Sequence, residues 1–319
     1  MTNPLRDETD RDAERYSDAP ATPVTSQPQV APVTAAADTA QRKLTNPWAS
    51  LFAVALAFLW TLPTFGLLVT SFRPQREIAT TGWWSFFTNP AVTLENYETV
   101  LSTEGSAGLG SAFINSLVIT IPSVLIPVTL ALLASYAFAW VEFKGRGLLF
   151  VIVFSLQIVP IQVTLIPLLT LYVDAGWAGT YLPIWLSHSI FALPLAIFIL
   201  HNFMREIPKE LLEAARMDGA GHVQILFQVL MPLLTPALAA FGIFQFLWVW
   251  NDLLVALVFG SSPNVAPITA ALANLAGTRG NAWHLLSAGA FVSIVVPVAV
   301  FLALQRYFVR GLLAGGLKG

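Results

Sequence analysis

The sequence has no cysteine among its 319 residues, and only 11% of its residues are charged. Without cysteine the chain forms no disulfide, thiolate nucleophile or cysteine-ligated metal site. A soluble domain carries about 25% charged residues, whereas this chain is 56% hydrophobic. This composition is that of an integral membrane protein. The net charge of −2 also gives no support to a nucleic-acid partner.

Several chemical motifs are missing as well. The chain has no G-x-x-x-x-G-K-[ST] phosphate-binding loop and no H-E-x-x-H zinc motif. His188 and His201 lie thirteen residues apart, which does not place them together on one helix face, so we interpret both as structural polar residues. We therefore predict no catalytic residue, no metal site and no cofactor bound by this chain. The apparent lack of mid-span carboxylates also disfavours a secondary transporter coupled to protons or sodium, which is kept as an alternative.

Residues 1–45 differ in character from the rest of the chain. They combine a charge-mixed start with Pro20, Pro23, Pro28 and Pro32 among Ala, Thr, Ser and Gln. Such a segment buries too little apolar area to offset its ordering entropy, so it is predicted to be a disordered tail. It has no apolar core of the kind found in signal peptides, so we expect no cleavage.

Six apolar segments follow, and each exceeds the roughly 20 residues that cross a bilayer core. The sequence therefore predicts an all-α membrane protein with six transmembrane helices. The segments are Trp48–Thr70, Ser111–Ala139, Leu148–Tyr172, Tyr181–Phe203, Ile225–Phe259 and Leu285–Tyr307.

The basic residues predict the orientation of these helices. Cytoplasmic loops are enriched in Lys and Arg. With a cytoplasmic N-terminus, thirteen of the sixteen Lys and Arg residues lie inside, and only Arg73, Arg76 and Arg279 lie outside. Both termini and the loop around Glu213 are then expected on the cytoplasmic side.

The longest polar interruption in the second half is residues 205–232. Pro208 suits the start of a short helix and Gly219 suits the position just past its end. That predicts a helix of about three turns. By pattern alone it is an ordinary amphipathic connector with solvated charges.

A motif in this loop resembles a known family. Glu213-Ala214-Ala215, three residues, Gly219, nine residues and Val229-Leu230-Met231-Pro232 resemble the EAA loop of bacterial ABC-importer permeases, EAA-x3-G-x9-I-x-L-P. Val229 replaces the usual Ile and Met231 the usual Leu. The resemblance implies a type I ABC-importer permease fold with a cytoplasmic coupling helix at 208–219. Glu213, Ala214, Ala215, Gly219, Leu211 and Leu212 would then contact or shape the contact with a partner ATPase.

Other segments look like the carbohydrate-importer group of this family. Thr93-Leu94-Glu95-Asn96-Tyr97 is similar to a segment common in its permeases, and Ser71-Phe72-Arg73 with Gly82-Trp83-Trp84 is similar to its α-glucoside branch. The aromatic first outer loop is open to two interpretations, an interfacial belt or a docking surface for an external partner.

The C-terminal end is similar to the tail of the maltose-type permease subunit that reaches into the ATPase dimer. It carries that subunit's G-x-x-A-G-x-x-K-G pattern through Gly319. The residues expected to contact the ATPase are Gly311, Ala314, Gly315 and Lys318.

Three polar residues in the spans are candidates for lining the pathway. Gln157, Gln245 and Asn251 are expected to face the interior of the bundle, where they either bind sugar hydroxyls or join helices; we favour the second. Asn251 belongs to Trp250-Asn251-Asp252, which resembles a sugar-permease signature. Asp252 lies near the predicted outer end, where a solvated or capping role and a place in the pathway are both open.

The resemblance covers about Trp48 to Gly319 and implies a set of partners. These are a second, similar permease in a heterodimer, two ATPase subunits with ATP and Mg, and an extracytoplasmic sugar-binding protein. We divide the chain into a 1–45 tail, a 46–110 segment with the first transmembrane helix and a long external loop, a 111–307 permease core, and a 308–319 cytoplasmic tail. The implied function is the permease subunit of an ATP-driven sugar importer in the cell membrane, with an α-glucoside or an oligosaccharide as the expected substrate. An importer for a non-sugar solute is the alternative.

Overall fold

The computed structural model describes residues 47–102, 109–278 and 282–316, and throughout these residues the regular structure is helical with no strand. The chain divides into two compact units, residues 1–62 and residues 63–319. Helix α3 (Pro47–Ser71) crosses the boundary between them. The functional features described below all lie in the 63–319 unit.

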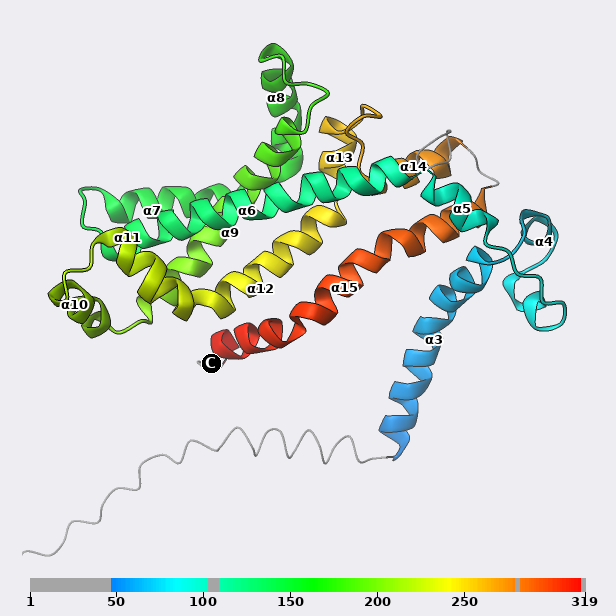
Figure 1. Cartoon of the computed structure of the whole chain (residues 1–319), viewed down its shortest axis with the longest axis horizontal. Helices are drawn as coiled ribbons and strands as arrows, with labels where there is room; N and C mark the ends of the chain where they lie inside the picture. Colours follow the sequence, from blue (N-terminus) through cyan, green and yellow to red (C-terminus); the bar gives the residue numbers. More distant parts are fainter. Residues whose placement is uncertain (1–46, 103–108, 279–281, 317–319) are drawn as a thin grey trace, which may run out of the picture. The chain divides into compact units, whose positions relative to one another are not determined.

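The helices of this unit follow one another with short connections (Figure 1). The segment after α3 holds three short helices, and the long helices come after it. In chain order they are α4 (Gln75–Thr80), η2 (Trp83–Phe87), α5 (Glu95–Leu101), α6 (Gly110–Trp140), α7 (Arg146–Ser155), η3 (Leu156–Ile158), α8 (Ile161–Asp174), α9 (Leu182–Arg205), α10 (Lys209–Met217), α11 (His222–Gln224), η4 (Ile225–Leu230), α12 (Met231–Trp250), α13 (Leu254–Phe259), α14 (Ile268–Thr278) and α15 (Trp283–Gly316).

Five helices of the described residues are long and apolar enough to cross a membrane, and a bent pair brings the number to six. Four of the five lie within the 63–319 unit, and the fifth is α3. The four are residues 110–140, 182–205, 222–250 and 283–305. Each matches a predicted span within a few residues at most ends. The fifth predicted span ends earlier than expected, at Trp250, because α13 forms a separate short helix.

The predicted span Leu148–Tyr172 is not one continuous helix. Residues Arg146–Ile158 and Ile161–Asp174 meet at an angle of 100°. Val159 adopts an extended conformation with ψ 119°, and Pro160 follows it. A proline disfavours helical geometry in the residue before it and lacks the N–H that would continue the ladder. The two helices together still count as one candidate span, bent at Pro160.

The main core lies where α6, α9 and α12 pack together. Ala131 of α6 and Ala196 of α9 are fully buried, and the hydroxyl of Ser135 donates to the carbonyl of Ile197 over 3.0 Å. Small residues of this kind let membrane helices approach closely. The core continues through Leu230 and Leu234 of the η4–α12 rod.

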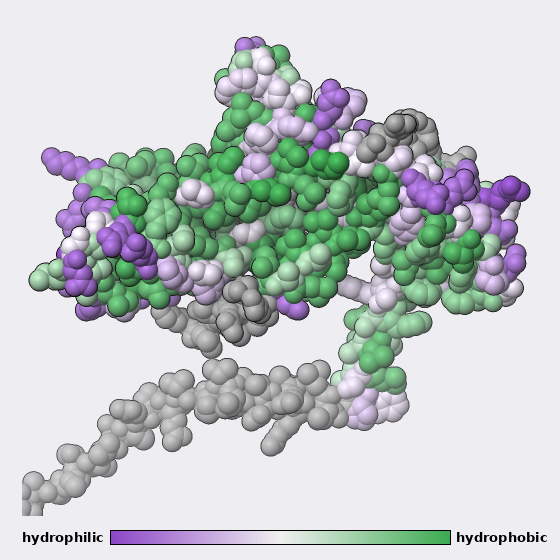
Figure 2. All heavy atoms as spheres, in the orientation of Figure 1, coloured by the Kyte–Doolittle hydropathy of each residue, from purple (hydrophilic) through white to green (hydrophobic). Residues whose placement is uncertain are grey.

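A second cluster lies at the opposite end of α6, where α5 and α14 pack on α15. Its buried members include Val100, Ile268 and Ala288. In Figure 2, apolar atoms cover the middle of the long helices, and hydrophilic atoms gather near α10 and α11 and around α4 and α5. The unit thus has an apolar middle and two polar ends.

Candidate functional site

Helix α10 begins at the junction that follows α9. Pro208 is the residue before the helix, with φ −58° and ψ 136°, and its carbonyl accepts the N–H of Leu211 over 3.3 Å. Pro208 therefore lies just before the helix, whereas the sequence predicts it as the first helical residue. Because its conformation is extended, the chain turns sharply between α9 and α10.

The end of α10 explains the spacing between the alanine pair and the glycine. The N–H of Ala220 donates to the carbonyl of Ala215 over 2.9 Å, and the N–H of Gly219 donates to Arg216 over 3.0 Å. Gly219 has φ +85°. Together these bonds form a Schellman cap, which needs a left-handed residue at this position. A glycine four residues after Ala215 is therefore what ends this helix.

The two sides of α10 differ in burial. Leu212 is 3% exposed and packs with Met204, Ile225 and Leu230, and the half-buried Ala215 joins the same cluster. On the other side Glu213 and Ala214 are exposed, Leu211 is 45% exposed and Met217 is 87% exposed. One face thus fixes α10 to the spans, and the other presents small, apolar and acidic groups.

A further contact fixes the segment after α10. The hydroxyl of Tyr136 on α6 lies 2.7 Å from Nδ1 of His222 on α11. The continuous helical segment His222–Trp250 begins with α11 and continues through the π-helical turn η4 into α12. Val229 and Leu230 of the EAA-like motif lie in the π turn, and Met231 and Pro232 are the first residues of α12.

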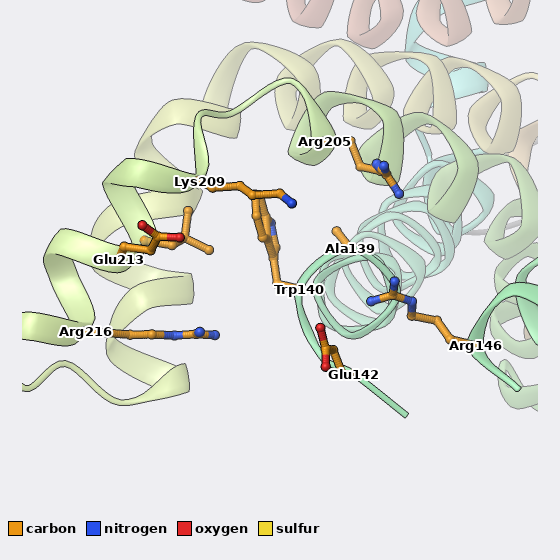
Figure 3. A pocket seen from close by; sticks show the side chains of 9 residues that line it. Ala139, Trp140, Glu142, Arg146, Arg205, Lys209, Glu213 and Arg216 are labelled. Atoms are coloured by element: carbon orange, nitrogen blue, oxygen red, sulfur yellow. The ribbon is translucent and has the colours of Figure 1, made fainter. Parts of the chain in front are cut away.

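A pocket of about 340 Å³ lies between α10 and the ends of the spans (Figure 3). Lys209 and Arg216 extend from α10 toward Trp140 and Arg146 on the facing side. The lining residues are Ala139, Trp140, Glu142, Arg146, Arg205, Lys209, Leu212, Glu213 and Arg216. Four cations and two carboxylates thus share one hollow.

The charges of this pocket are not neutralised in pairs. Among the described residues, His188 and Asp252 form an ion pair within 4.0 Å, but this pair lies outside the pocket. Arg146 donates to the carbonyl of Val141 over 3.1 Å. The indole N–H of Trp140 is buried and has no acceptor among the described atoms. The pocket therefore has donors and positive charge to offer.

The other end of the unit contains a buried arginine. Arg73 is 2% exposed, and its guanidinium donates to the carbonyl of Gly82 over 2.9 Å and to the hydroxyls of Thr81 (2.6 Å) and Ser85 (3.0 Å). These bonds close the segment 73–85 into a loop around one cation. A buried charge is tolerated when its donors are satisfied in this way.

The segment Thr93-Leu94-Glu95-Asn96-Tyr97 fastens the same loop. The side-chain amide of Asn96 donates to the carbonyls of Ser71 and Arg73, each over 2.9 Å. The hydroxyl of Tyr97 lies 2.8 Å from that of Ser71. Ser71 and Arg73 are the ends of the other quoted segment, so two resemblances in the sequence belong to one hydrogen-bonded structure.

His188 and Asp252 form a pair between α9 and the residues after α12. Nε2 of His188 is 3.7 Å from Oδ2 of Asp252, and the same carboxylate oxygen accepts the N–H of Ala256 over 3.0 Å. Asp252 thus caps the start of α13, as one of its two interpretations expected, but its side chain is only 10% exposed and is not solvated. It lies beyond the α12 span, and burial raises the pKa of its carboxyl while His188 acts in the opposite direction.

The three candidate pathway residues are not equivalent. Gln245 is 4% exposed and donates to the carbonyl of Ser123 over 3.1 Å, so it joins α12 to α6. Gln157 and Asn251 are exposed, the first in the η3 turn and the second just past α12. Both lie where a helix ends, and their expected position facing the bundle interior stays a prediction. A role in lining the pathway stays a prediction.

The candidate residues of the C-terminal tail are described only in part. Gly311, Ala314 and Gly315 lie within the backbone of α15, which extends to Gly316. Lys318 lies outside the described residues, as does the 1–45 segment. The predicted contact of this tail with an ATPase stays a prediction.

The family comparison decides the class of protein. Residues 128–313 match the family described as the binding-protein-dependent transport system inner membrane component. The chain belongs to this family. This permease is thus a membrane-spanning transport subunit and not itself an enzyme. Its family works with a binding protein and an ATPase, and the permease is a multi-pass inner-membrane component.

Named relatives cover most of the permease. It is 52% identical over 270 residues to the osmoprotective compounds uptake permease protein GgtD of Synechocystis sp., covering 83% of this chain and 90% of that one. It is 50% identical over 254 residues to the alpha-glucoside transport system permease protein AglG of Rhizobium meliloti, covering 77% of this chain and 66% of AglG. It is 35% identical to the melibiose/raffinose/stachyose import permease protein MelC of Bacillus subtilis, covering 85% of this chain and 96% of MelC.

A solved structure shows the same fold. The permease matches a chain from a bacterial ABC transporter involved in the import of alginate with a TM-score of 0.68 and 20% identity, covering 82% of this chain and 96% of that one. The predicted ABC-importer permease fold is confirmed.

Sequence reasoning missed two features of this permease. The burial of Arg73 was not predicted, although its neighbours Thr81 and Ser85 offered acceptors. The pocket brings Trp140 and Arg146 from α6 and α7 to α10, residues some 70 positions apart in sequence. The signal available was that Arg146 and Arg205 each lie at an end of an apolar segment.

Proposed function

We propose that this permease couples sugar import to ATP hydrolysis in a partner ATPase, with α10 as the mechanical contact. The observation that carries the proposal is the division of α10 into two faces. Leu212 anchors the helix in the core, Glu213 is exposed beside the pocket that it lines, and the opposite face exposes Ala214 and Met217. A helix held on one side transmits a force applied to the other.

The individual roles follow from these positions. Glu213 is proposed to make a charge-assisted contact with the ATPase. Ala214 lets the partner approach closely, and Leu211 and Met217 supply apolar contact. Gly219 ends the helix so that the chain can turn into α11. The Pro208 and Gly219 junctions make α10 a compact element of nine residues.

We further propose the assembly and orientation of the importer. Both termini and α10 face the cytoplasm, as the distribution of basic residues supports. This permease pairs with a second, similar permease, and two ATPase subunits bind ATP and Mg below them. An extracytoplasmic sugar-binding protein delivers substrate to the other side. The chain has no phosphate-binding loop, which supports hydrolysis in a separate polypeptide.

The proposed substrate is an α-glucoside or a related oligosaccharide. Relatives at 50% and 35% identity are named for alpha-glucosides and for melibiose, raffinose and stachyose. The relative at 52% identity is named for osmoprotective compounds, which supports an osmoprotective solute as the second candidate.

The test is ATPase stimulation in the complete reconstituted importer, with its binding protein, by a panel of solutes. We expect stimulation by α-glucosides, and loss of that stimulation in Glu213→Lys. Stimulation by an osmoprotective solute alone would remove the sugar assignment and keep the coupling. Full stimulation in Glu213→Lys would contradict the coupling role.

A further inference from the structure

The pocket beside α10 lies at the level where two spans end. Trp140 is the last residue of the 110–140 span, and Arg205 is the last residue of the 182–205 span. Both line the pocket. Lipid headgroups occupy the zone just outside the apolar core, where Trp side chains are enriched. The pocket is therefore at headgroup depth.

Its cations come from separate segments of the chain. Arg146 begins α7, Arg205 ends α9, and Lys209 and Arg216 belong to α10. Glu142 and Glu213 oppose them, so the lining has two more positive than negative groups. None of the four cations has an ion-pair partner within 4.0 Å among the residues described. Like charges gathered without partners repel, and an anion between them relieves that repulsion.

The donors in the pocket suit a phosphate group. Arg forms bidentate bonds to phosphate oxygens, and Lys binds phosphate as a point charge. The volume of about 340 Å³ is more than ten times the roughly 30 Å³ that a water occupies in the liquid. A headgroup-sized anion therefore fits.

We propose that this pocket binds the phosphate headgroup of an anionic phospholipid. Basic pockets between membrane helices on the cytoplasmic side are typical sites for such headgroups. The apolar face of α7 supports a lipid over a soluble phosphate ester. Directly after Arg146, the side chains of Leu148 (68%), Val151 (58%) and Ile152 (49%) are exposed, and acyl chains can lie along a surface of this kind.

The site would connect the lipid to the coupling element. A headgroup held by Arg146, Arg205 and Lys209 bridges α7, α9 and α10 across one hollow. The bound lipid then stabilises the position of α10 against the spans. This role does not depend on which solute the importer carries.

The test measures the melting temperature of the purified complete importer in neutral detergent during three titrations. The probes are dioctanoyl phosphatidylglycerol, dioctanoyl phosphatidylcholine and glycerol 3-phosphate. A ligand that binds the folded state raises the melting temperature with concentration. The variants are Arg146→Gln with Arg205→Gln, and Glu142→Gln. Lys144→Gln is the matched control, because Lys144 is exposed in the same loop and does not line the pocket.

We expect phosphatidylglycerol to raise the melting temperature, with phosphatidylcholine much weaker. The double variant should weaken the response about tenfold or more, since each cation contributes a charged hydrogen bond. Glu142→Gln should strengthen it several-fold, because a repelling carboxylate is gone, and this variant still tests the site if the double variant fails to fold. Lys144→Gln should match the wild type.

Three outcomes would overturn the proposal. The first is an equal response to phosphatidylglycerol in wild type and both pocket variants. The second is a response to glycerol 3-phosphate that equals the response to phosphatidylglycerol, which would assign the pocket to a soluble phosphate ester. The third is loss of the ATPase subunit from the double variant with an unchanged lipid response, which would assign the cations to the ATPase contact.

Discussion

At one end of α6, Arg73 is 2% exposed and its guanidinium donates to Gly82, Thr81 and Ser85. At the other end, four cations surround a pocket and make no ion pair within 4.0 Å among the described residues. The first end satisfies its buried charge within the chain. The second leaves charged groups and an apolar side chain, Met217, open to another molecule. The difference indicates which end is built to be completed by a partner.

The largest expected effect is at the end of the unit that carries α10. Glu213→Lys reverses an exposed charge on α10, and we expect ATPase association to weaken about 100-fold or more, as when a charge pair at an interface is broken. Membrane insertion should be normal. Co-purification of the ATPase with the permease measures this. Glu98→Lys, the same reversal at an exposed site on α5, should leave association unchanged, and equal losses in both variants would remove the distinction between the two ends.

The second prediction separates the anchoring face of α10 from its free face. Leu212→Ala removes a side chain that is 3% exposed, and local stability should fall by about 2 to 4 kcal/mol. Leu211→Ala removes the same atoms from a half-exposed site and should cost less than about 1 kcal/mol. Hydrogen exchange across residues 205–221 measures both. Matching exchange rates in the two variants would show that α10 is not held as described.

The third prediction concerns the end of the unit that holds the buried Arg73. Arg73→Met leaves three acceptors without their donor, and we expect a loss of about 2 to 3 kcal/mol. Thermal unfolding in detergent measures the loss, and ATPase association should be unaffected. The control is Arg76→Met, because Arg76 is exposed and its replacement should lie within about 0.5 kcal/mol. Weaker association of the Arg73→Met variant with the ATPase would contradict the independence of the two ends.

The smallest expected effect is at the end of α10. Gly219→Ala places a side chain at φ +85°, which costs roughly 1 to 2 kcal/mol. Neither Gly219 nor Gly221 has an atom within 4 Å of the position of an added Cβ, so the cost is conformational alone. Gly221 has φ −78°, and Gly221→Ala should be nearly neutral. Hydrogen exchange of α10 distinguishes the two, and equal protection would argue against the Schellman cap.

The sequence predicted the elements whose signals are local. The start and end of α10 follow from Pro208 and Gly219, and most spans follow from long apolar runs. The break at Pro160 does not follow from the sequence alone, because proline also occurs inside continuous helices here, as Pro122 and Pro127 do in α6. Composition alone does not distinguish a kink from a break.

The remaining features depend on contacts between distant segments. From the sequence Arg73 is predicted as a surface cation, and its burial depends on the contacts with Thr81 and Ser85. The pocket needs α6, α7, α9 and α10 to end near one another, which no single stretch of sequence encodes. The surroundings of Gln157 and Asn251 depend on a similar feature, because each lies at a helix end whose position the sequence did not predict.

The most direct test of the account compares the two ends by cysteine labelling. The chain has no cysteine, so single substitutions give unambiguous sites. Met217→Cys and Leu94→Cys replace side chains that are 87% and 58% exposed, one on α10 and one just before α5. We predict that the partner ATPase protects Met217→Cys from a hydrophilic thiol reagent and leaves Leu94→Cys unprotected. Labelling of Met217→Cys at the same rate with and without the ATPase would contradict the proposal that α10 is the docking element.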